Sequence, residues 1–274
     1  LTQALEPFAH LLAQGMVIKD GAKMSKSKGN VVDPDEIISA YGADTARIFI
    51  LFAAPPVKDL EWSDQGVEGS SRFLNRVWRI FGEFVEAIKT VKLPGESFTT
   101  TVPEIKALRR MTHITIRRVT DDIATRMQFN TAIAAIMELV NHLFSFKDWW
   151  KNKNNQNETS QMALREALET LILTLSPFAP HIAEELGSLI GLSKTLDQIT
   201  WPQYIEALTQ TDEMLIVLQV NGKVRQKISV ESCISDDDLK TRSLEDLKIK
   251  EWTQGKEVKK VIVIPKKLVN IVVQ

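Results

Sequence analysis

The sequence predicts a mainly α-helical protein with a small α+β domain near its C-terminus. From about residue 64 to residue 191, apolar side chains recur at three-to-four spacing, which is the period of an amphipathic helix. From Met214 onward the pattern becomes that of short strands, and Asn221-Gly222 is a strong two-residue hairpin signal. A chain of 274 residues with 44% hydrophobic content is long enough for two or three domains with real cores.

The N-terminal region is expected to alternate a short strand with helices. Residues 16–18 indicate a strand, and Asp20-Gly21 is a turn signal that leads into a lysine-rich segment. Asp33-Pro34, followed by two acidic residues, is typical of a helix N-terminus. A second helix is predicted over residues 46–52, with Asp44 as a candidate cap. We expect Arg47 to brace the lysine-rich segment through an acid such as Asp44.

The central region is expected to form an antiparallel helix bundle. Long amphipathic helices joined by short connections favour up-and-down neighbours. The predicted helices cover about residues 64–91, 103–126, 130–152, 159–175 and 180–191. Basic residues recur on the first two helices, and two interpretations stay open: a solvated face with ion pairs within the helix, or contacts to an RNA backbone. The candidate RNA-contacting residues are Arg72, Arg76, Arg79, Arg117 and Arg118.

The C-terminal region is expected to be a compact β-β-α-β-β domain. Its helix begins at a Ser235 cap and runs to about residue 250; strands are predicted over 214–220, 223–230, 258–264 and 268–273. Residues 214–274 contain 12 basic and 8 acidic side chains, a net charge of +4 in a chain whose total is −1. Such a concentration favours nucleic-acid attachment, although lysines also protect edge strands from pairing. The candidates are Lys223, Arg225, Lys259, Lys260, Lys266 and Lys267.

Composition excludes several classes of protein. With a net charge of −1, the chain as a whole is not an electrostatic nucleic-acid binder, so any RNA contact must come from local basic patches. Cys233 is the only cysteine, which excludes an internal disulfide framework and fits a reducing compartment. The histidines are scattered without zinc-site spacing. No apolar run approaches the length of a membrane span, and we expect a cytoplasmic protein.

The lysine-rich segment is the most informative stretch of the chain. Lys23, Lys26 and Lys28 fall within six residues, separated by Ser25 and Ser27. Ammonium groups are too strongly hydrated to be buried alone, so the segment is expected to be an exposed loop. Mobile positive charges and hydroxyl groups suit the binding of phosphates, whereas the alternative is a solvated basic turn.

The order of residues resolves this choice. Lys23-Met24-Ser25-Lys26-Ser27 matches the second signature of class I aminoacyl-tRNA synthetases. The similarity continues through Tyr41-Gly42-Ala43-Asp44 and Leu60-Glu61-Trp62-Ser63-Asp64, and reaches Gln219-Val220-Asn221-Gly222-Lys223. Together these stretches resemble bacterial-type leucyl-tRNA synthetases along nearly the whole chain.

The resemblance implies a role for each residue of the segment. Lys26 would stabilise charge on the ATP phosphates during formation of leucyl-adenylate, and Lys23 would help to position the loop. Ser25 and Ser27 would hydrogen-bond phosphate or backbone, and Met24 and Val31 would line the adenine side. Mg²⁺ is expected with ATP, but no local carboxylate cluster indicates a metal site. tRNA(Leu), ATP and leucine are the implied partners.

The resemblance also divides the chain into three regions. Residues 1–63 would end a class I nucleotide-binding domain and form its stem-contact segment, residues 64–200 would form an anticodon-binding-type bundle, and residues 201–274 a connector and a tRNA-binding domain. The remainder of the catalytic domain is expected to precede Leu1, either covalently or as a separate subunit. The chain alone should therefore be inactive.

Two alternatives remain at this stage. Valyl, isoleucyl and methionyl enzymes share the lysine signature, and the amino-acid pocket that would separate them is not in this sequence. The chain could also be a non-catalytic tRNA-binding module, used as a chaperone or scaffold. The intact lysine signature argues against this second alternative, because a pure binder does not need a transition-state loop.

Overall fold

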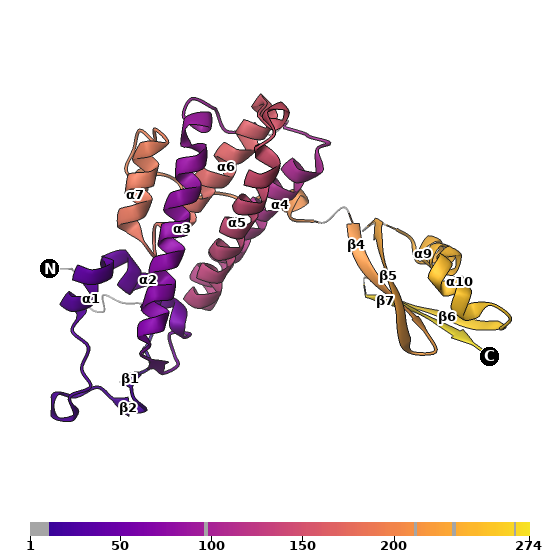
Figure 1. The fold of residues 1–274 in the computed structure, drawn as a ribbon, viewed down its shortest axis with the longest axis horizontal. Helices are drawn as coiled ribbons and strands as arrows, with labels where there is room; N and C mark the ends of the chain where they lie inside the picture. Colours follow the sequence, from indigo (N-terminus) through magenta and orange to yellow (C-terminus); the bar gives the residue numbers. More distant parts are fainter. Residues whose placement is uncertain (1–10, 96–97, 211–212, 232–233, 266) are drawn as a thin grey trace. The chain divides into compact units, whose positions relative to one another are not determined.

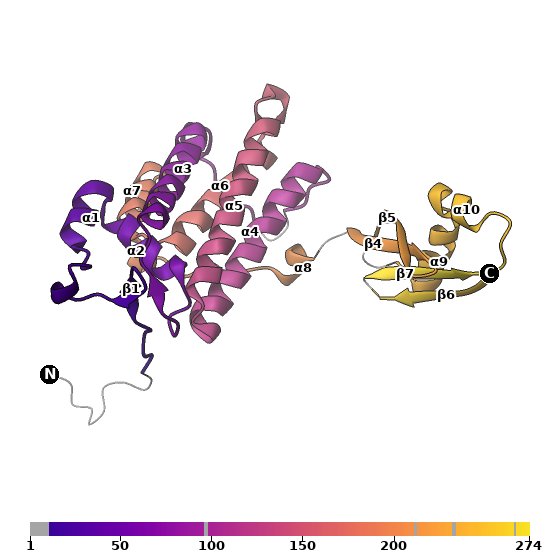
Figure 2. The same ribbon diagram turned by 60° about the horizontal axis from the view of Figure 1, so that its bottom comes forward.

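The computed structural model describes residues 11–274, except residues 96–97, 211–212, 232–233 and 266 (Figure 1). The chain divides into two compact units, Leu1–Thr209 (unit 1) and Gln210–Gln274 (unit 2). Unit 1 is mainly helical and unit 2 combines a sheet with two helices, as the views in Figures 1 and 2 show. The predicted class, mainly helical with small sheets, is confirmed. In the described residues, no helix has both the length and the apolarity that a membrane span requires.

A small sheet begins the described part of unit 1. It contains β1 (Val17–Lys19), β2 (Ala22–Lys23) and β3 (Leu60–Glu61) in the order β2-β1-β3. β1 pairs antiparallel with β2 and parallel with β3. Asp20 and Gly21 adopt positive φ values of 56° and 69°, which confirms the turn expected between the first two strands.

Two short helices follow, α1 (Pro34–Tyr41) and α2 (Ala43–Ala53). Asp33 caps α1 as predicted, because its side chain accepts a hydrogen bond from the Asp35 N–H. The cap predicted for α2 is wrong: Gly42 occupies that position without a side-chain hydrogen bond. The Asp44 side chain instead contacts His181 and accepts a hydrogen bond from the Ile182 N–H, so α1 and α2 meet at Gly42 without a local cap.

Unit 1 continues with a bundle of long helices, which run up and down beside one another in Figure 2. These are α3 (Asp64–Ile88), α4 (Pro103–Asp121), α5 (Phe129–Trp150), α6 (Glu158–Leu175) and α7 (Pro180–Leu189). Their positions agree with the predicted helices, with one difference. The second helix ends at Asp121 and passes into a π-helical turn over Asp122–Arg126, where the buried Asp122 carboxylate binds Arg126 and Thr131. A short helix, α8 (Glu206–Thr209), ends the unit.

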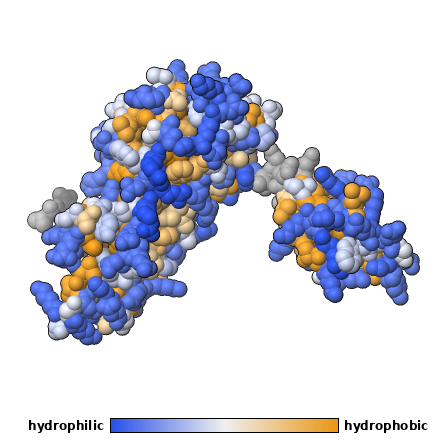
Figure 3. All heavy atoms as spheres, viewed as in Figure 1, coloured by the Kyte–Doolittle hydropathy of each residue, from blue (hydrophilic) through white to orange (hydrophobic). Residues whose placement is uncertain are grey.

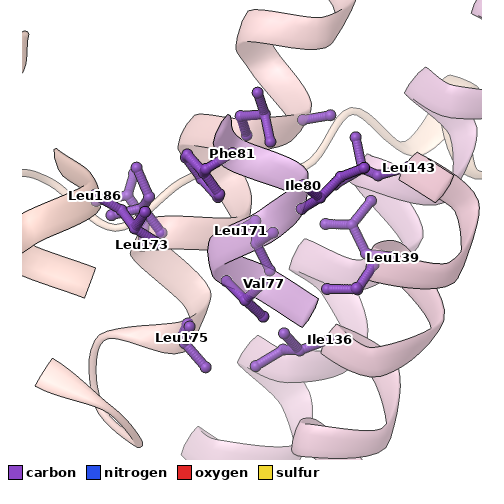
Figure 4. Packing of buried hydrophobic residues seen from close by; sticks show 14 of the residues in the cluster. Val77, Ile80, Phe81, Ile136, Leu139, Leu143, Leu171, Leu173, Leu175 and Leu186 are labelled. Atoms are coloured by element: carbon purple, nitrogen blue, oxygen red, sulfur yellow. The ribbon is translucent and has the colours of Figure 1, made fainter. Parts of the chain in front are cut away.

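The bundle core is apolar and includes residues of all the long helices. Figure 4 shows core residues of α3, α5, α6 and α7. Val77 and Ile80 of α3, Leu139 of α5 and Leu171 of α6 are fully buried. Phe84 of α3 packs edge-on against another ring of the core, that of Trp150. The three-to-four spacing read from the sequence therefore marks the faces that pack together.

Several charged groups of the bundle are buried or nearly buried, among them Arg109 and Glu166. Glu166 of α6 accepts two hydrogen bonds from Arg109 of α4, at 2.8 and 3.1 Å, and lies 3.2 Å from His113 Nε2. Burial raises the pKa of the Glu166 carboxyl, but the hydrogen bonds from His113 and Arg109 outweigh burial and leave this pKa below its ordinary value. The bidentate pair joins α4 to α6 inside the bundle.

Unit 2 consists of β4 (Glu213–Val220), β5 (Lys223–Glu231), α9 (Asp236–Glu245), α10 (Leu247–Thr253), β6 (Val258–Ile264) and β7 (Leu268–Val273). The four strands have the order β5-β4-β7-β6. Residues of β4, β7 and the helices, among them Leu218, Ile271 and Ile249, share one core. The single helix predicted here is wrong, because the chain breaks at Asp246, whose side chain caps α10.

Candidate functional site

The lysine loop (residues 23–30) joins β2 to α1. Lys26–Lys28 forms one turn of 3₁₀-helix, and Gly29 closes it with a φ of 66° and a hydrogen bond from its N–H to Lys26 O. Lys23, Lys26 and Lys28 are exposed, as expected of hydrated ammonium groups. The loop lies at the lower left of Figure 1, away from the long helices of the bundle. Its lysines are therefore open to a ligand from solvent.

The predicted nucleotide-binding residues all lie on this loop or directly after it. Lys23, Lys26, Ser27 and Val31 are exposed, whereas Met24 and Ser25 are half-buried. The Ser25 and Ser27 hydroxyl groups lie 3.2 Å apart. In the described part of the chain, no carboxylate forms an ion pair with the lysines of the loop. The arrangement offers ammonium donors without a carboxylate partner among the described residues, beside two hydroxyl groups that hydrogen-bond each other.

Asn30 fastens the lysine loop to the β1–β2 hairpin. Its side-chain oxygen accepts a hydrogen bond from the Ser25 N–H, and its Nδ2 faces three hairpin carbonyls. Sequence reasoning identified the lysines and serines but missed this residue. The available signal was the Gly29-Asn30 pair that ends the segment, since asparagine often hydrogen-bonds nearby backbone in loops.

Helix α2 connects the N-terminal region to the bundle. The Asp44 carboxylate lies 2.8 Å from His181 Nδ1 and accepts a hydrogen bond of 2.7 Å from the Ile182 N–H, at the start of α7. The expected link from Arg47 to Asp44 is wrong. Arg47 instead donates to the carbonyls of Phe178 and Pro177, at 3.1 and 2.8 Å. Both side chains therefore hold α2 against the turn between α6 and α7.

A groove of about 370 Å³ lies beside this connection, between α1, α3 and α7. Trp78 of α3 and Tyr41 of α1 line it with side chains that are 45% and 39% exposed. Exposed aromatic rings next to arginines are typical of RNA-binding surfaces, because bases stack on the rings while arginines bind phosphates. Figure 3 shows hydrophobic residues exposed among hydrophilic ones over this part of unit 1.

The arginines predicted to bind RNA differ in their surroundings. On α3, Arg79 is exposed, Arg72 pairs with Glu68 at 3.4 Å, and Arg76 donates to Asn141 and lies over the Phe144 ring. On α4, Arg118 pairs with Glu138 of α5. Intrahelical and interhelical partners thus occupy several of these side chains. Their exposed parts can still contact phosphate oxygens.

Arg117 has a further role, at the end of unit 1. Its Nη1 donates to Glu206 and Thr209 of α8, both at 3.2 Å. Trp201 Nε1 donates to Thr120, and the Ile205 N–H donates to His113 Nδ1. These contacts fix the connector along α4, and nothing in the local sequence predicts them.

Unit 2 carries its candidate residues on β5, β6 and the turn before β7. Lys223, Lys259, Lys260 and Lys267 are exposed, and Lys266 lies outside the described residues. Arg225 is held differently: its guanidinium carbon lies 3.4 Å from the centre of the Trp252 ring. Its buried Nε has no acceptor among the described residues. The stacking fixes the guanidinium plane, and the terminal Nη donors are the ones that an external acceptor could reach.

No metal site accompanies these residues in the described ranges of the chain, since no group of three or more His, Cys, Asp or Glu side chains is placed to hold an ion.

Known proteins match this chain along nearly its whole length. The family model for "tRNA synthetases class I (I, L, M and V)" matches residues 2–63, and the model for "Anticodon-binding domain of tRNA ligase" matches residues 106–237. A curated leucine–tRNA ligase from Geotalea uraniireducens (strain Rf4) is 53% identical over 268 residues, which cover 98% of this chain. The ligase from Syntrophobacter fumaroxidans is 50% identical over 269 residues. Along 98% of its length, the chain is therefore homologous to part of curated leucine–tRNA ligases.

Only part of such a ligase is present. The chain spans 32% of the length of these curated relatives. A crystal structure of the LeuRS of Agrobacterium radiobacter K84, in a ternary complex with tRNA and LeuAMS, has a TM-score of 0.79 and 29% identity. The structural match covers 95% of this chain and 32% of the Agrobacterium chain. In the present chain, the match to the class I synthetase model contains the whole lysine loop. The match to the anticodon-binding model includes most of the bundle.

Proposed function

We propose that this chain supplies the ATP-handling loop and the tRNA-binding surfaces of a leucine–tRNA ligase. The single observation that supports this best is the exposed 3₁₀ turn of the lysine loop, whose ammonium groups have no carboxylate partner among the described residues. Its position inside the class I synthetase match agrees with the proposal.

The reaction explains why lysines are useful here. A carboxylate oxygen of leucine attacks the α-phosphorus of ATP, and the bond from that phosphorus to the pyrophosphate oxygen breaks. A ribose hydroxyl of the terminal adenosine of tRNA(Leu) then attacks the leucyl carbonyl carbon, and AMP leaves. Negative charge increases on the phosphates in the first transition state, and Lys26 would stabilise that charge. A contact made late in the reaction accelerates the chemical step rather than tightening ATP binding.

The other loop residues would support the same step. Lys23 would position the loop, the Ser25 and Ser27 hydroxyls would donate to phosphate oxygens, and Met24 and Val31 would contact the adenine side. Mg²⁺ would be held chiefly by the phosphates of ATP, because the described residues offer no carboxylate cluster for it. When bound, the ion would neutralise part of the phosphate charge.

The tRNA-binding surfaces would lie in both units. In unit 1 we propose backbone contacts by Arg72, Arg76 and Arg79 beside the Trp78 groove, and by the exposed parts of Arg117 and Arg118. In unit 2 we propose phosphate contacts by Arg225 on its Trp252 support and by the basic residues Lys223, Lys259, Lys260, Lys266 and Lys267. Such contacts position tRNA without reading its sequence. A cytoplasmic location is part of this proposal.

A chimeric ligase tests the proposal. This chain is joined to the preceding part of the Geotalea uraniireducens ligase, and leucine-dependent exchange between ATP and pyrophosphate is measured. Lys26→Ala should lower the exchange rate about 100-fold or more with a small change in the KM for ATP, the pattern of a lost transition-state contact. Lys153→Ala is the matched control, because Lys153 is an exposed lysine that also begins a 3₁₀ turn, in the bundle.

The other outcomes contradict the proposal in distinct ways. Full exchange in the Lys26→Ala variant would show that the loop is a solvated turn. A folded chimera that binds tRNA but performs no exchange would favour the non-catalytic tRNA-binding module. Exchange promoted by valine, isoleucine or methionine in place of leucine would favour a related class I synthetase.

A further inference from the structure

The side chain of Asn30 connects both ends of the lysine loop. Its Oδ1 accepts a hydrogen bond of 2.9 Å from the Ser25 N–H. Its Nδ2 donates to Lys19 O at 3.1 Å and lies 3.4 Å from the carbonyl oxygens of Ala22 and Lys23. One amide group thus contacts an N–H donor in the loop and three carbonyl acceptors in the β1–β2 hairpin.

These partners determine the orientation of the amide group. Rotating it by half a turn would place Oδ1 against the carbonyl oxygens and Nδ2 against the Ser25 N–H, which would lose every hydrogen bond. An asparagine is therefore required chemically, since it offers an acceptor and donors on the same short side chain. Aspartate would retain the acceptor but would place negative charge beside three carbonyl oxygens.

The contacts of Asn30 act on the residue next to Lys26. Ser25 precedes the 3₁₀ turn directly, and the turn has no buried residue that could anchor it by packing. Within the described residues, the Lys26 side chain has no partner, and its backbone carbonyl accepts only the Gly29 N–H of the same turn. The hydrogen bonds of Asn30 and those of the turn are therefore what holds the Lys26 backbone in place.

We propose that Asn30 is the positioning residue of the lysine loop. It holds the 3₁₀ turn against the hairpin, so that the backbone carrying the Lys26 side chain is already in place when phosphate charge develops. This inference rests on the proposed function, and it concerns Asn30 acting through Lys26 rather than touching ATP. Preorganised groups lose little when the reaction proceeds, whereas a displacement of about 1 Å can cost about 100-fold in rate.

The experiment compares Asn30 variants in the chimeric ligase. Asn30→Ala should lower kcat for leucine-dependent exchange by about 10- to 100-fold, with less than about a threefold change in the KM for ATP. Asn30→Asp should be at least as slow. The thermal unfolding midpoint should stay within about 1 °C, since the loop contributes no residue to a core. Asn155→Ala is the matched control, because its amide donates a comparable hydrogen bond of 2.8 Å to Trp149 O in a bundle turn.

A double variant separates positioning from a general structural effect. If Asn30 acts through Lys26, Lys26→Ala combined with Asn30→Ala should be no slower than Lys26→Ala alone. The inference would be overturned if the rate losses of the two single variants multiplied in the double variant, or if Asn30→Ala showed a normal exchange rate. If Lys26→Ala loses exchange while Asn30→Ala retains it, the positioning role fails and the proposed function stands. If Lys26→Ala retains exchange, the proposed function itself fails.

Discussion

The lysine loop and the helix bundle treat their charged groups in opposite ways. In the bundle, the buried Arg109 and the nearly buried Glu166 bind each other through two hydrogen bonds. In the loop, Lys23, Lys26 and Lys28 are exposed, and a single asparagine side chain fastens the backbone. Charged groups that pair with each other help to hold the helices together, whereas charged groups without protein partners are available to a ligand. Substitutions in the bundle core should therefore lower the free energy of unfolding, whereas substitutions in the loop should act mainly on the exchange between ATP and pyrophosphate.

The largest expected effect is the loss of a buried ring in the bundle. Phe84→Ala should lower the free energy of unfolding by about 4 kcal/mol, because it removes apolar burial and leaves a cavity. Urea unfolding followed by circular dichroism measures the loss. Val31→Ala, an exposed apolar position beside the loop, should change this free energy by less than about 0.5 kcal/mol. Similar losses of unfolding free energy in both variants would contradict the expectation that the bundle core, and not the loop region, stabilises the fold.

The second-largest expected effect is the loss of the ion pair between Arg109 and Glu166. Glu166→Gln should destabilise the bundle by about 3 kcal/mol, since it leaves the Arg109 guanidinium buried without a carboxylate. Glu86 is the matched control, because it pairs with Lys89 on the surface, where an ion pair contributes at most about 1 kcal/mol. The same urea experiment applies. A Glu166→Gln variant as stable as Glu86→Gln would show that the buried pair does not hold α4 to α6.

Two glycine substitutions should have smaller effects of opposite sign. Gly82 lies inside α3, exposed, with nothing near an added Cβ, so Gly82→Ala should stabilise the bundle by about 0.7 kcal/mol. Gly29 has a φ of 66°, so Gly29→Ala should strain the lysine loop by about 1 kcal/mol. Unfolding curves test the first expectation, and a slower ATP–pyrophosphate exchange tests the second. Unchanged exchange in Gly29→Ala would show that the loop tolerates other turn conformations.

The smallest expected effect is the response to acid. The pKa of the Glu166 carboxyl lies below its ordinary value of 4.5, because hydrogen bonds from His113 and Arg109 outweigh its burial. A lowered folded-state pKa contributes stability that is fully present above about pH 4.5 and is lost as the pH falls through the folded value. Urea midpoints of the native chain should therefore decrease below about pH 4.5 more steeply than those of Glu166→Gln. Parallel curves would assign the acid sensitivity to other groups.

Much of the fold could be predicted because its signals are local. The spacing of apolar residues located the long helices, and Asn221-Gly222 located the β4–β5 hairpin, whose turn residues have positive φ values of 50° and 78°. Two predicted helices were wrong because one side chain changes the backbone locally, and the spacing of apolar residues does not reveal such a change. Asp246 caps a new helix and divides the one that was predicted, and Asp122 stabilises a π-helical turn where a continuous helix was expected.

The sequence by itself located the lysine loop, since the strong hydration of ammonium groups keeps lysines at the surface. Only the tertiary structure decided which residues hold that loop and its neighbours. Asp44 meets His181 across 137 residues of chain, and Arg117 meets Thr209 across 92. Periodicity shows which face of a helix is buried, but a polar side chain chooses its partner by three-dimensional proximity. For the same reason Asn30, whose backbone partners could not be read from residue types, became visible only in the folded chain.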